Sequence, residues 1–421
     1  MRRGWSVVVL GVLVLLAGLV GWRIVTTALS AHWLAEEPER ALAWNPAEPA
    51  ARLAHARASL DAGESAAAAR QARRVLQAEP LQAEGLVLLA RVADAEYDPR
   101  VSELFRRALQ RSPRDQYARA WMIDELLRTG HYDEAIVHVN VLLGFAPWLQ
   151  EILLPTLAEA SSDREFAASL SRALSGHPGW RSALLDDLLA RGDPGVIETV
   201  YGSLLTRHEL SDREARRWFD WLGRAGRWGE AYSHWVSWLQ LPAGAGVSLV
   251  DDGGFDHSAR GLGFGWRMQG GANALIERVR EADNTVVRVT FLGRRTSWIG
   301  LAQNLFLAPG RYHLQFRAAA RDVRSDRGIH WIIACHGGSP IRVETEALQG
   351  SFDWKVVERV FEIPSRDCPA QELALVNPGS AGAGKMVSGT LWLDDFVIVP
   401  IPAGSDAPAP DPGAPAEKSL Y

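Results

Sequence analysis

The chain has 421 residues, enough for two or three domains, and a formal net charge of −5 at pH 7. This small negative charge argues against a large nucleic-acid-binding surface, so we expect no nucleic-acid partner. The basic charge is almost all arginine, because lysine occurs only at Lys355, Lys385 and Lys418.

An uncharged apolar run, WSVVVLGVLVLLAGLVGW, occupies residues 5–22. Its length is close to the ~20 residues that cross the core of a bilayer. Arg2 and Arg3 precede it, so the positive-inside rule predicts a cytoplasmic N-terminus and an external remainder. We therefore predict a single-pass anchor over residues 1–30 in the inner membrane of a bacterium, with the bulk of the chain in the periplasm or outside. The alternative is a cleaved signal peptide.

Residues 116–147 have the pattern of two short amphipathic helices. Apolar residues form one stripe before Gly130 and a second stripe after it. Gly130 suits a tight turn, and Pro147 ends the unit because proline cannot continue a helix. The predicted stripes are Ala120, Ile123, Leu126 and Leu127, then Ala135, Val139, Leu142 and Leu143. A single helix pair cannot bury both stripes, so we expect copies of the unit on either side.

The same unit recurs along the chain. Its closing prolines are spaced by 34, 33 and 34 residues, at Pro46, Pro80, Pro113 and Pro147. Its turns are similar in sequence: DAGESAAAA at 61–69, TGHYDEAI at 129–136 and AGRWGEAY at 225–232. These features resemble the tetratricopeptide repeat, with Gly130, Tyr132, Ala135 and Pro147 at matching positions of that repeat. The resemblance implies an α-solenoid of about six helix pairs over residues 33–242, whose groove binds a protein partner.

Parts of this region depart from the repeat. Residues 82–113 lack a glycine at the turn, and residues 149–208 keep only the pattern of paired helices. The last pair is rich in aromatic residues: Trp218, Phe219, Trp221, Trp228, Tyr232, Trp235 and Trp238. At helical spacing such residues usually pack a core, and we expect them to pack against the next domain. The alternative is a surface on which a ligand stacks.

After residue 242 the pattern changes. Proline and small residues in LPAGAGVS predict a linker over residues 243–248. The apolar period then changes from 3.6 to 2, which predicts strands at 285–292, 311–319, 329–335, 354–363, 372–376 and 390–399. About eight short strands over residues 249–400 favour an antiparallel β-sandwich. Residues 401–421, rich in proline and alanine, are predicted to form a disordered tail.

The predicted sandwich begins and ends with distinctive motifs. It opens LVDDGGFDHSARGLGFGW at 249–266 and closes GTLWLDDFVIV at 389–399, with LAQNLFLAPGRYHLQFRA at 301–318 between them. Together these motifs resemble the galactose-binding-like jelly roll of carbohydrate-binding modules. The resemblance implies a jelly-roll fold, a polysaccharide ligand in some members, and often a structural calcium ion near the two ends.

Several acidic residues lie at these ends. Because the first and last strands of a jelly roll lie together, we expect Asp252, Asp256 and Asp395 to converge as oxygen ligands of a structural calcium ion. The alternative is that they are surface-loop carboxylates. Asp251, Asp252, Asp256, Asp394 and Asp395 could also supply the two carboxylates that glycoside hydrolysis needs. No nucleophile-elbow, HExxH or Cys-x-x-Cys motif occurs in the chain, so we expect no enzyme and no other cofactor.

The candidate ligand-binding residues of the sandwich are four tryptophans. Trp266, Trp298 and Trp354 lie near predicted strand ends, and Trp392 lies in a strand whose buried face is ambiguous. Exposed indoles there would form a platform on which sugar rings stack. The alternative for each of them is core packing, which we predict for Trp331.

The chain has two cysteines, Cys335 and Cys368. Both lie in the part that we place outside the membrane, where an oxidising compartment favours a disulfide worth roughly 3–4 kcal/mol. A metal site that includes His336 is the first alternative, but a fourth ligand and close cysteine spacing are missing. A catalytic Cys335 is the second, but adjacent strand residues such as Cys335 and His336 point to opposite faces.

These patterns predict an α-then-β chain that acts as a membrane-anchored, non-catalytic scaffold. Its repeat groove would bind a protein partner, and its sandwich would contact glycan or protein. Exopolysaccharide or capsule assembly or export is the process that the combined resemblances suggest. The alternatives are a glycan-active enzyme that uses the aspartates at the sandwich ends, and a protein–protein adaptor whose jelly roll binds no ligand.

Overall fold

The structure of the chain, a computed structural model, describes residues 2–242, 246–257, 261–281, 284–337, 342–378 and 385–402. For residues 2–9 only the backbone is described. Residues 243–245 of the predicted linker and 403–421 of the predicted tail therefore lie outside the described part. The chain divides into two compact units, Met1–Val200 and Tyr201–Tyr421.

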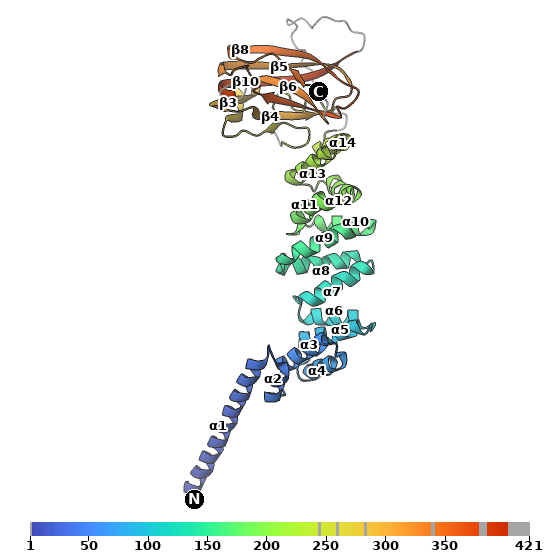
Figure 1. The fold of residues 1–421 in the computed structure, drawn as a ribbon, viewed down its shortest axis with the longest axis vertical. Coiled ribbons are helices and arrows are strands. Elements are labelled where there is room, and N and C mark those ends of the chain that lie inside the picture. Colours follow the sequence, from blue (N-terminus) through green and yellow to red (C-terminus); the bar gives the residue numbers. More distant parts are fainter. Residues whose placement is uncertain are drawn as a thin grey trace. The chain divides into compact units, whose positions relative to one another are not determined.

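Within the described residues, fourteen α-helices precede ten β-strands (Figure 1), which confirms the predicted α-then-β fold. The helices are α1 (Arg2–Trp33), α2 (Pro38–Trp44), α3 (Pro49–Asp61), α4 (Ser65–Ala78), α5 (Ala83–Ala95), α6 (Val101–Arg111), α7 (Gln116–Arg128), α8 (Tyr132–Phe145), α9 (Gln150–Ala160), α10 (Arg164–Leu174), α11 (Arg181–Arg191), α12 (Pro194–Thr206), α13 (Asp212–Arg224) and α14 (Trp228–Leu239). A short 3-10 helix, η1 (Pro147–Leu149), lies between α8 and α9.

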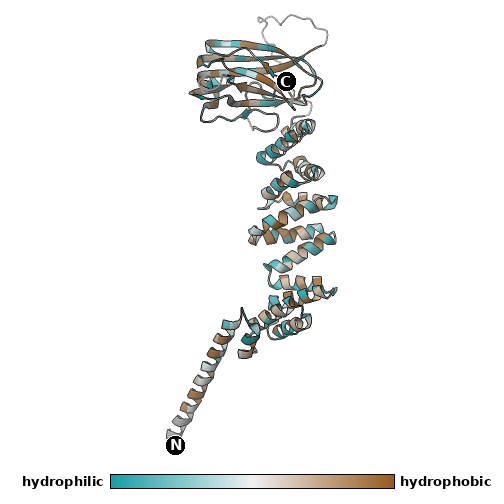
Figure 2. Ribbon diagram, viewed as in Figure 1, coloured by the Kyte–Doolittle hydropathy of each residue, from teal (hydrophilic) through white to brown (hydrophobic). Residues whose placement is uncertain are grey.

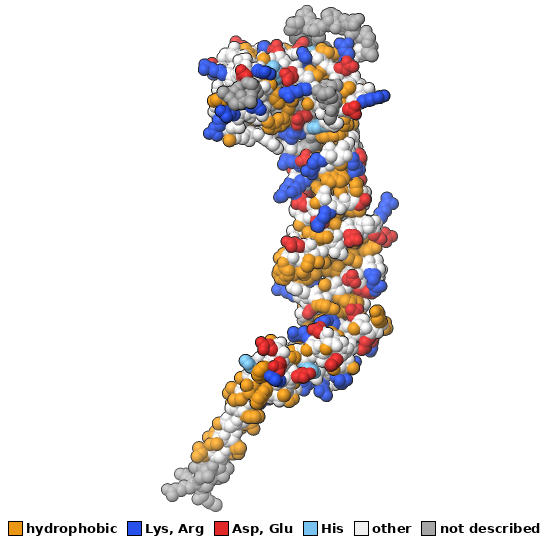
Figure 3. Space-filling model, in the orientation of Figure 1, with side chains coloured by type: hydrophobic (Ala, Val, Ile, Leu, Met, Phe, Trp, Pro, Cys, Tyr) orange, Lys and Arg blue, Asp and Glu red, His pale blue; other side chains and the backbone are white. Residues whose placement is uncertain are grey.

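Helix α1 contains the apolar run. Its stretch Leu10–Trp33 is long and apolar enough to cross a membrane. Large apolar side chains along it, such as those of Leu13, Leu19 and Trp22, are exposed. Hydrophobic side chains accordingly cover the surface of α1 (Figures 2 and 3). By length and composition, a membrane anchor and a signal sequence both fit this helix.

In the first unit, α2 to α8 each pack on the next helix along the chain, and then α10 packs on α8 and α11 on α9. Helix α8 buries Ala135, Val139, Leu142 and Leu143, as predicted. On α7 the buried stripe includes Ala118 and Met122 together with Ile123 and Leu126, whereas the predicted Ala120 is exposed. The buried stripe of α7 thus begins one half-turn earlier than the pattern indicated.

Four of the helix pairs turn through a left-handed residue. Gly130 has φ +76°, and Gly63 and Gly226 have φ +80° and +73° at the matching turns. Between α5 and α6, where the sequence has no glycine, Tyr97 adopts φ +56°. The backbone bond that closes the turn is the same in both cases: Asp98 N donates to Ala93 O at 2.8 Å, and His131 N donates to Leu126 O at 2.8 Å. The turn geometry is therefore kept where the glycine is lost.

The strands form two antiparallel five-stranded sheets. Sheet A has the order β1-β4-β9-β6-β7, and sheet B has the order β2-β3-β10-β5-β8. The strands are β1 (Arg267–Met268), β2 (Ala274–Glu281), β3 (Asn284–Arg295), β4 (Trp298–Leu305), β5 (Gly310–Arg324), β6 (His330–His336), β7 (Arg342–Glu344), β8 (Gly350–Ile363), β9 (Ala370–Val376) and β10 (Met386–Ile401). All six predicted strands are present, and β1, β2, β4 and β7 were not predicted.

The main core of the sandwich lies between the two sheets. Trp331 of β6 is fully buried there, as predicted, and Phe316 of β5 stacks on Phe396 of β10 with a ring-centroid distance of 4.8 Å. Both hydrophobic and hydrophilic residues occur along the strands (Figure 2), and in β5 buried residues alternate with less buried ones over Tyr312–Ala318.

The hairpin α13–α14 belongs to the same compact unit as the sandwich. Three aromatic residues of α14 contact three rings of the sandwich, and we call these six residues the aromatic joint: Trp228, Tyr232 and Trp235 with Phe264, Phe306 and His336. Tyr232 stacks on Phe306 at 4.9 Å, Trp235 lies 5.5 Å from Phe264, and Trp228 stacks on His336 at 4.2 Å. The prediction that these helical aromatics pack against the next domain is therefore confirmed.

Candidate ligand-binding surfaces of the sandwich

The opening and closing segments of the sandwich meet, as predicted. Phe396 N, near the end of β10, donates to Gly253 O at 2.9 Å. The predicted acidic ligands nevertheless have separate partners. The carboxylate of Asp252 accepts hydrogen bonds from the backbone and ring nitrogens of His257, and that of Asp395 pairs with Arg317 at 3.3 Å.

The predicted calcium ligands therefore do not converge. Among the described residues, no group of three or more His, Cys, Asp or Glu side chains could hold a metal ion. Asp252 has φ +47° and Asp395 has φ +54°, so each lies in a tight bend. The prediction that Asp252, Asp256 and Asp395 form one ligand set is wrong, because these bends direct two of the carboxylates to different partners.

Trp266 is a core residue and not part of a ligand platform. Its side chain is 1 % exposed and packs on Phe255, Trp331 and Phe396. Its indole Nε1 donates to Asp252 O at 3.1 Å, which satisfies the one polar atom of the ring. The opening motif of the sandwich thus uses its tryptophan to anchor the opening turn to the core.

Trp354 and Trp392 lie together on the outer face of sheet B. Trp392 of β10 pairs with Ala319 of β5. On the other side of β5, Ala318 pairs with Lys355 and Ala320 with Phe352, so Trp354 of β8 lies opposite Ala319 across a register shift. The two indoles are half-buried and flank this alanine.

An arginine lies over each of these two rings. The guanidinium of Arg317 is 5.1 Å from the ring centroid of Trp354, and that of Arg321 is 5.9 Å from that of Trp392. Such cation–π contacts hold an indole in one orientation. We call Arg317, Ala319, Arg321, Trp354 and Trp392 the tryptophan platform.

Trp298 lies apart from this platform. It begins β4 in sheet A, pairs with Val376 of β9, and is 46 % exposed. Two of the four predicted tryptophans are thus brought together, one lies on the other sheet and one is in the core. The strand order, which the sequence pattern does not contain, decides this grouping.

Asp394, beside the tryptophan platform on β10, is a buried carboxylate. It is 1 % exposed, its Oδ2 accepts a hydrogen bond from Asn284 Nδ2 at 2.6 Å, and its Oδ1 has no hydrogen-bond partner among the described residues. Burial raises the pKa of Asp394 to about 6, although a backbone hydrogen bond from Asp395 partly opposes the rise. Solvent cannot reach this carboxylate, which distinguishes it from the exposed carboxylate of Asp395.

The raised pKa predicts how stability depends on pH. The folded chain holds this proton up to about pH 6, whereas an unfolded aspartate releases it near pH ~3.9. The contribution of Asp394 to stability is therefore full below about pH 4 and is lost as the pH rises through about 6. We expect Asp394→Asn to be more stable than the wild type at pH 7.5, by up to about 3 kcal/mol, and to lose this advantage at pH 4.

The measurement is thermal unfolding of both proteins across this pH range. Asp395→Asn is the matched control, because its exposed carboxylate forms a surface ion pair with Arg317 that is worth only ~0–1 kcal/mol. If the stability of Asp394→Asn differed from that of the wild type by the same amount at every pH, the titration could not be assigned to Asp394.

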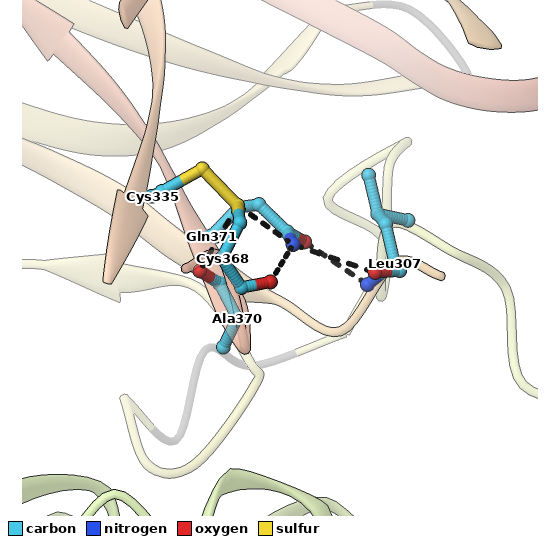
Figure 4. The surroundings of a disulfide bond; sticks show 5 residues. All are labelled: Leu307, Cys335, Cys368, Ala370 and Gln371. Atoms are coloured by element: carbon cyan, nitrogen blue, oxygen red, sulfur yellow. Dashed lines mark hydrogen bonds between the residues drawn. A yellow bond between two sulfur atoms is a disulfide. The ribbon is translucent and has the colours of Figure 1, made fainter. Parts of the chain in front are cut away.

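Cys335 and Cys368 form the predicted disulfide (Figure 4). Beside it lies Gln371, which is fully buried. Gln371 Nε2 donates to Cys368 O at 3.3 Å, and Gln371 Oε1 accepts from Leu307 N at 3.0 Å. The disulfide and this glutamine together tie the segment before β9 to the end of β6 and to the loop after β4.

The residues that follow the two cysteines, His336 and Pro369, line a cavity that the sequence analysis missed. Its polar lining residues are Asp220 and Arg224 of α13, Arg267 of β1, Asn304 of β4, His336 of β6 and Glu372 of β9. These residues come from five elements that are far apart in the sequence. The one sequence feature that points to this cavity is the high aromatic content of residues 218–238, the helices that form one of its walls.

No protein-family model matches the sequence, and no curated protein matches it. Solved structures match parts of the chain at low similarity. One described as "CBM4 structure and function" has 16% identity and a TM-score of 0.28, over 36% of this chain and 99% of the other. A "Family 16 Carbohydrate Binding Module-2" has 14% identity and a TM-score of 0.25, over 36% and 99%.

A third solved structure is described as a functional characterisation of Pseudomonas aeruginosa pilF. It has 19% identity and a TM-score of 0.23, over 48% of this chain and 78% of the other. All three TM-scores are low, so no conclusion about function is drawn from them.

Proposed function

We propose that this protein is a non-catalytic glycan-binding scaffold, held at a bacterial cytoplasmic membrane by α1. The tryptophan platform carries this proposal. Strands β8 and β10 are both neighbours of β5, so the strands that carry Trp354 and Trp392 lie about 9.6 Å apart, twice the ~4.8 Å spacing of neighbouring strands. The side chain of Ala319, between them, is small, so a flat ligand can contact both rings without a clash.

The chemistry of the platform suits a sugar chain. The C–H face of a sugar ring is apolar and stacks on an indole, whose ring is large and rigid. We expect the guanidinium groups of Arg317 and Arg321, which lie over the two rings, to move aside when a sugar stacks there and then to donate N–H hydrogen bonds to its hydroxyl groups. Repeating aromatic contacts at a fixed spacing favour a polymer with a regular repeat over a small molecule.

The helical array supplies a second surface, which we assign to a protein partner. Val137 and Val141 of α8, Trp148 of η1 and Ile152 of α9 are exposed. Exposed aliphatic and aromatic side chains of this kind are typical of protein–protein contact surfaces. A scaffold that binds both a glycan and a protein would act in exopolysaccharide or capsule assembly or export.

Two observations support the orientation that we propose. Arg2 and Arg3 precede the apolar part of α1, which favours a cytoplasmic N-terminus. The disulfide between Cys335 and Cys368 requires an oxidising compartment, such as the periplasm. Both observations support our proposal that the second unit lies outside the cytoplasm.

Two observations support a non-catalytic role over a glycan-active enzyme. Hydrolysis of a glycosidic bond needs two carboxyl groups that reach the same bond. Asp394 is buried away from solvent, and Asp252 is bonded to His257. The exposed carboxylate of Asp395 pairs with Arg317. We therefore expect no release of reducing ends from any polysaccharide that the protein binds.

The test is binding of the detergent-solubilised full chain to a panel of bacterial polysaccharides by affinity electrophoresis. We expect Trp392→Ala and Trp354→Ala each to weaken binding about tenfold, because one lost aromatic contact is worth roughly 1–1.5 kcal/mol. Trp298→Ala, an exposed tryptophan of the other sheet, is the matched control and should bind as the wild type does. A wild type that binds no member of the panel would favour the adaptor alternative, and release of reducing ends would favour the enzyme.

A further inference from the structure

A cavity of about 660 Å³ lies between α13 and the outer face of sheet A. Both walls belong to one compact unit, Tyr201–Tyr421. The volume falls in the range of ~300–1,000 Å³ that is typical of small-molecule sites. This cavity is separate from the tryptophan platform, which lies on sheet B.

The polar groups on the sheet wall are held in place by one another. Arg267 of β1 forms an ion pair with Glu372 of β9. His336 Nε2 lies 3.2 Å from Asn304 Oδ1, and Asn304 Nδ2 donates to Gly263 O at 3.0 Å. Because each side chain is fixed by a partner on another element, a ligand would meet a wall that is already ordered.

The helix wall offers two charged groups. Partial burial raises the pKa of Asp220, and the nearby charges of Arg267, Arg224 and Arg216 oppose the rise. Asp220 and Arg224 are one turn apart on α13, and both line the cavity. Both are exposed, and neither makes a hydrogen bond or ion pair with any of the residues that the structure describes. They therefore keep a full set of acceptors and donors for a ligand.

The charges in the lining cancel. Asp220 and Glu372 carry one negative charge each, and Arg224 and Arg267 carry one positive charge each. Such a site gives no net Coulomb attraction to a polyanion or a polycation. Its carboxylates accept hydrogen bonds, and its guanidinium groups donate them. Neighbouring hydroxyl groups of a ligand can satisfy both kinds of group, since each hydroxyl both donates and accepts.

Apolar surface completes the lining. The exposed Pro369 and the half-buried Trp228, whose ring stacks on His336, line the cavity, and the buried rings of Phe219 and Phe264 lie behind them. Aromatic and proline surface of this kind suits the C–H face of a sugar ring. Burial lowers the pKa of His336, and Arg267 adds to the effect, so the imidazole is neutral at pH 7 and both donates and accepts.

We propose that this cavity binds an uncharged oligosaccharide, taken either as a free short sugar or as the end of a longer neutral glycan. Asp220 and Arg224 bind its hydroxyl groups from the helix, and Glu372 and Asn304 bind it from the sheet. The site needs both α13 and the sandwich, so neither element alone would bind this ligand. The cavity and the tryptophan platform share no residue. A substitution in one site therefore tests that site alone, and the two proposals can be rejected separately.

The experiment uses the full chain in a polyoxyethylene detergent, because a maltoside headgroup would compete for the site. A glycan array with neutral and uronate-containing oligosaccharides identifies a bound sugar, and calorimetric titration with that oligosaccharide measures its affinity. We expect a neutral oligosaccharide to bind, and Asp220→Asn and Arg224→Gln each to weaken it at least tenfold. Arg213→Gln, an exposed arginine of the same helix outside the cavity lining, should leave the affinity unchanged.

Three results would overturn the proposal: binding of uronate-containing glycans alone, binding of a neutral glycan that neither cavity variant weakens, or no binding to the array. The melting temperature of each variant shows whether it is folded.

Loss of binding in Trp392→Ala without loss in the cavity variants would reject the cavity and keep the platform. The opposite pattern would reject the platform and keep the cavity. Comparison of a short free sugar with the same sugar at the end of a polymer distinguishes the two sources of ligand.

Discussion

Replacing Gly263 by alanine is expected to lower the melting temperature of the second unit by on the order of 10 °C. Gly263 has φ +59° and lies against the aromatic joint. A β-carbon there would lie 2.4 Å from Trp235 Cδ1 and 3.2 Å from Phe219 Cδ2. Both rings are buried and cannot move away, so the added methyl group must separate α14 from the sandwich.

Gly261 provides a matched control for this prediction. It has φ +63°, and the nearest atom to its added β-carbon would be 3.7 Å away. Gly261→Ala therefore has the same backbone cost of roughly 1–2 kcal/mol but no steric clash. Thermal unfolding followed by tryptophan fluorescence should show a clearly larger loss for Gly263→Ala, and equal losses in the two variants would mean that the aromatic joint contributes little to stability.

Removing the disulfide is expected to destabilise the second unit by about 3–4 kcal/mol. Cys335 and Cys368 are 33 residues apart in sequence, and in the chain-entropy account the crosslink restricts the unfolded chain over that loop. The variant with both cysteines replaced by serine should melt roughly 6–16 °C below the oxidised wild type.

Reductant serves as the internal control. Dithiothreitol should lower the melting temperature of the wild type to about that of the double variant and leave the double variant unchanged. A wild type that melts at the same temperature with and without reductant would show that the crosslink does not contribute to stability.

Much of the architecture was predictable from the sequence, because it follows from local patterns. The apolar run of α1, the glycine and proline at the ends of helix pairs, and the alternation in the long strands each specify one element. Strands β2 and β4 escaped prediction for a physical reason. β2 lies at the edge of sheet B, where most of its side chains are partly or fully exposed, and β4 is buried along most of its length, so neither alternates clearly.

The candidate sites were less predictable, because they depend on which strands become neighbours. Trp354 and Trp392 share a platform only because β5 lies between their strands. Trp266 lies near a predicted strand end, where the sequence left both a ligand platform and core packing open, and its burial decides for the core. The cavity draws its polar groups from α13 and four strands, and no spacing in the sequence connects them.

The disulfide has a further consequence for how the chain matures. The chain contains two cysteines, so oxidation can join them within the molecule in one way only. Pairing of β6 with β9 sets Cys335 opposite Gln371, close to Cys368. An oxidase alone should therefore complete the crosslink, and an isomerase that reshuffles wrong pairs would have no substrate in this protein.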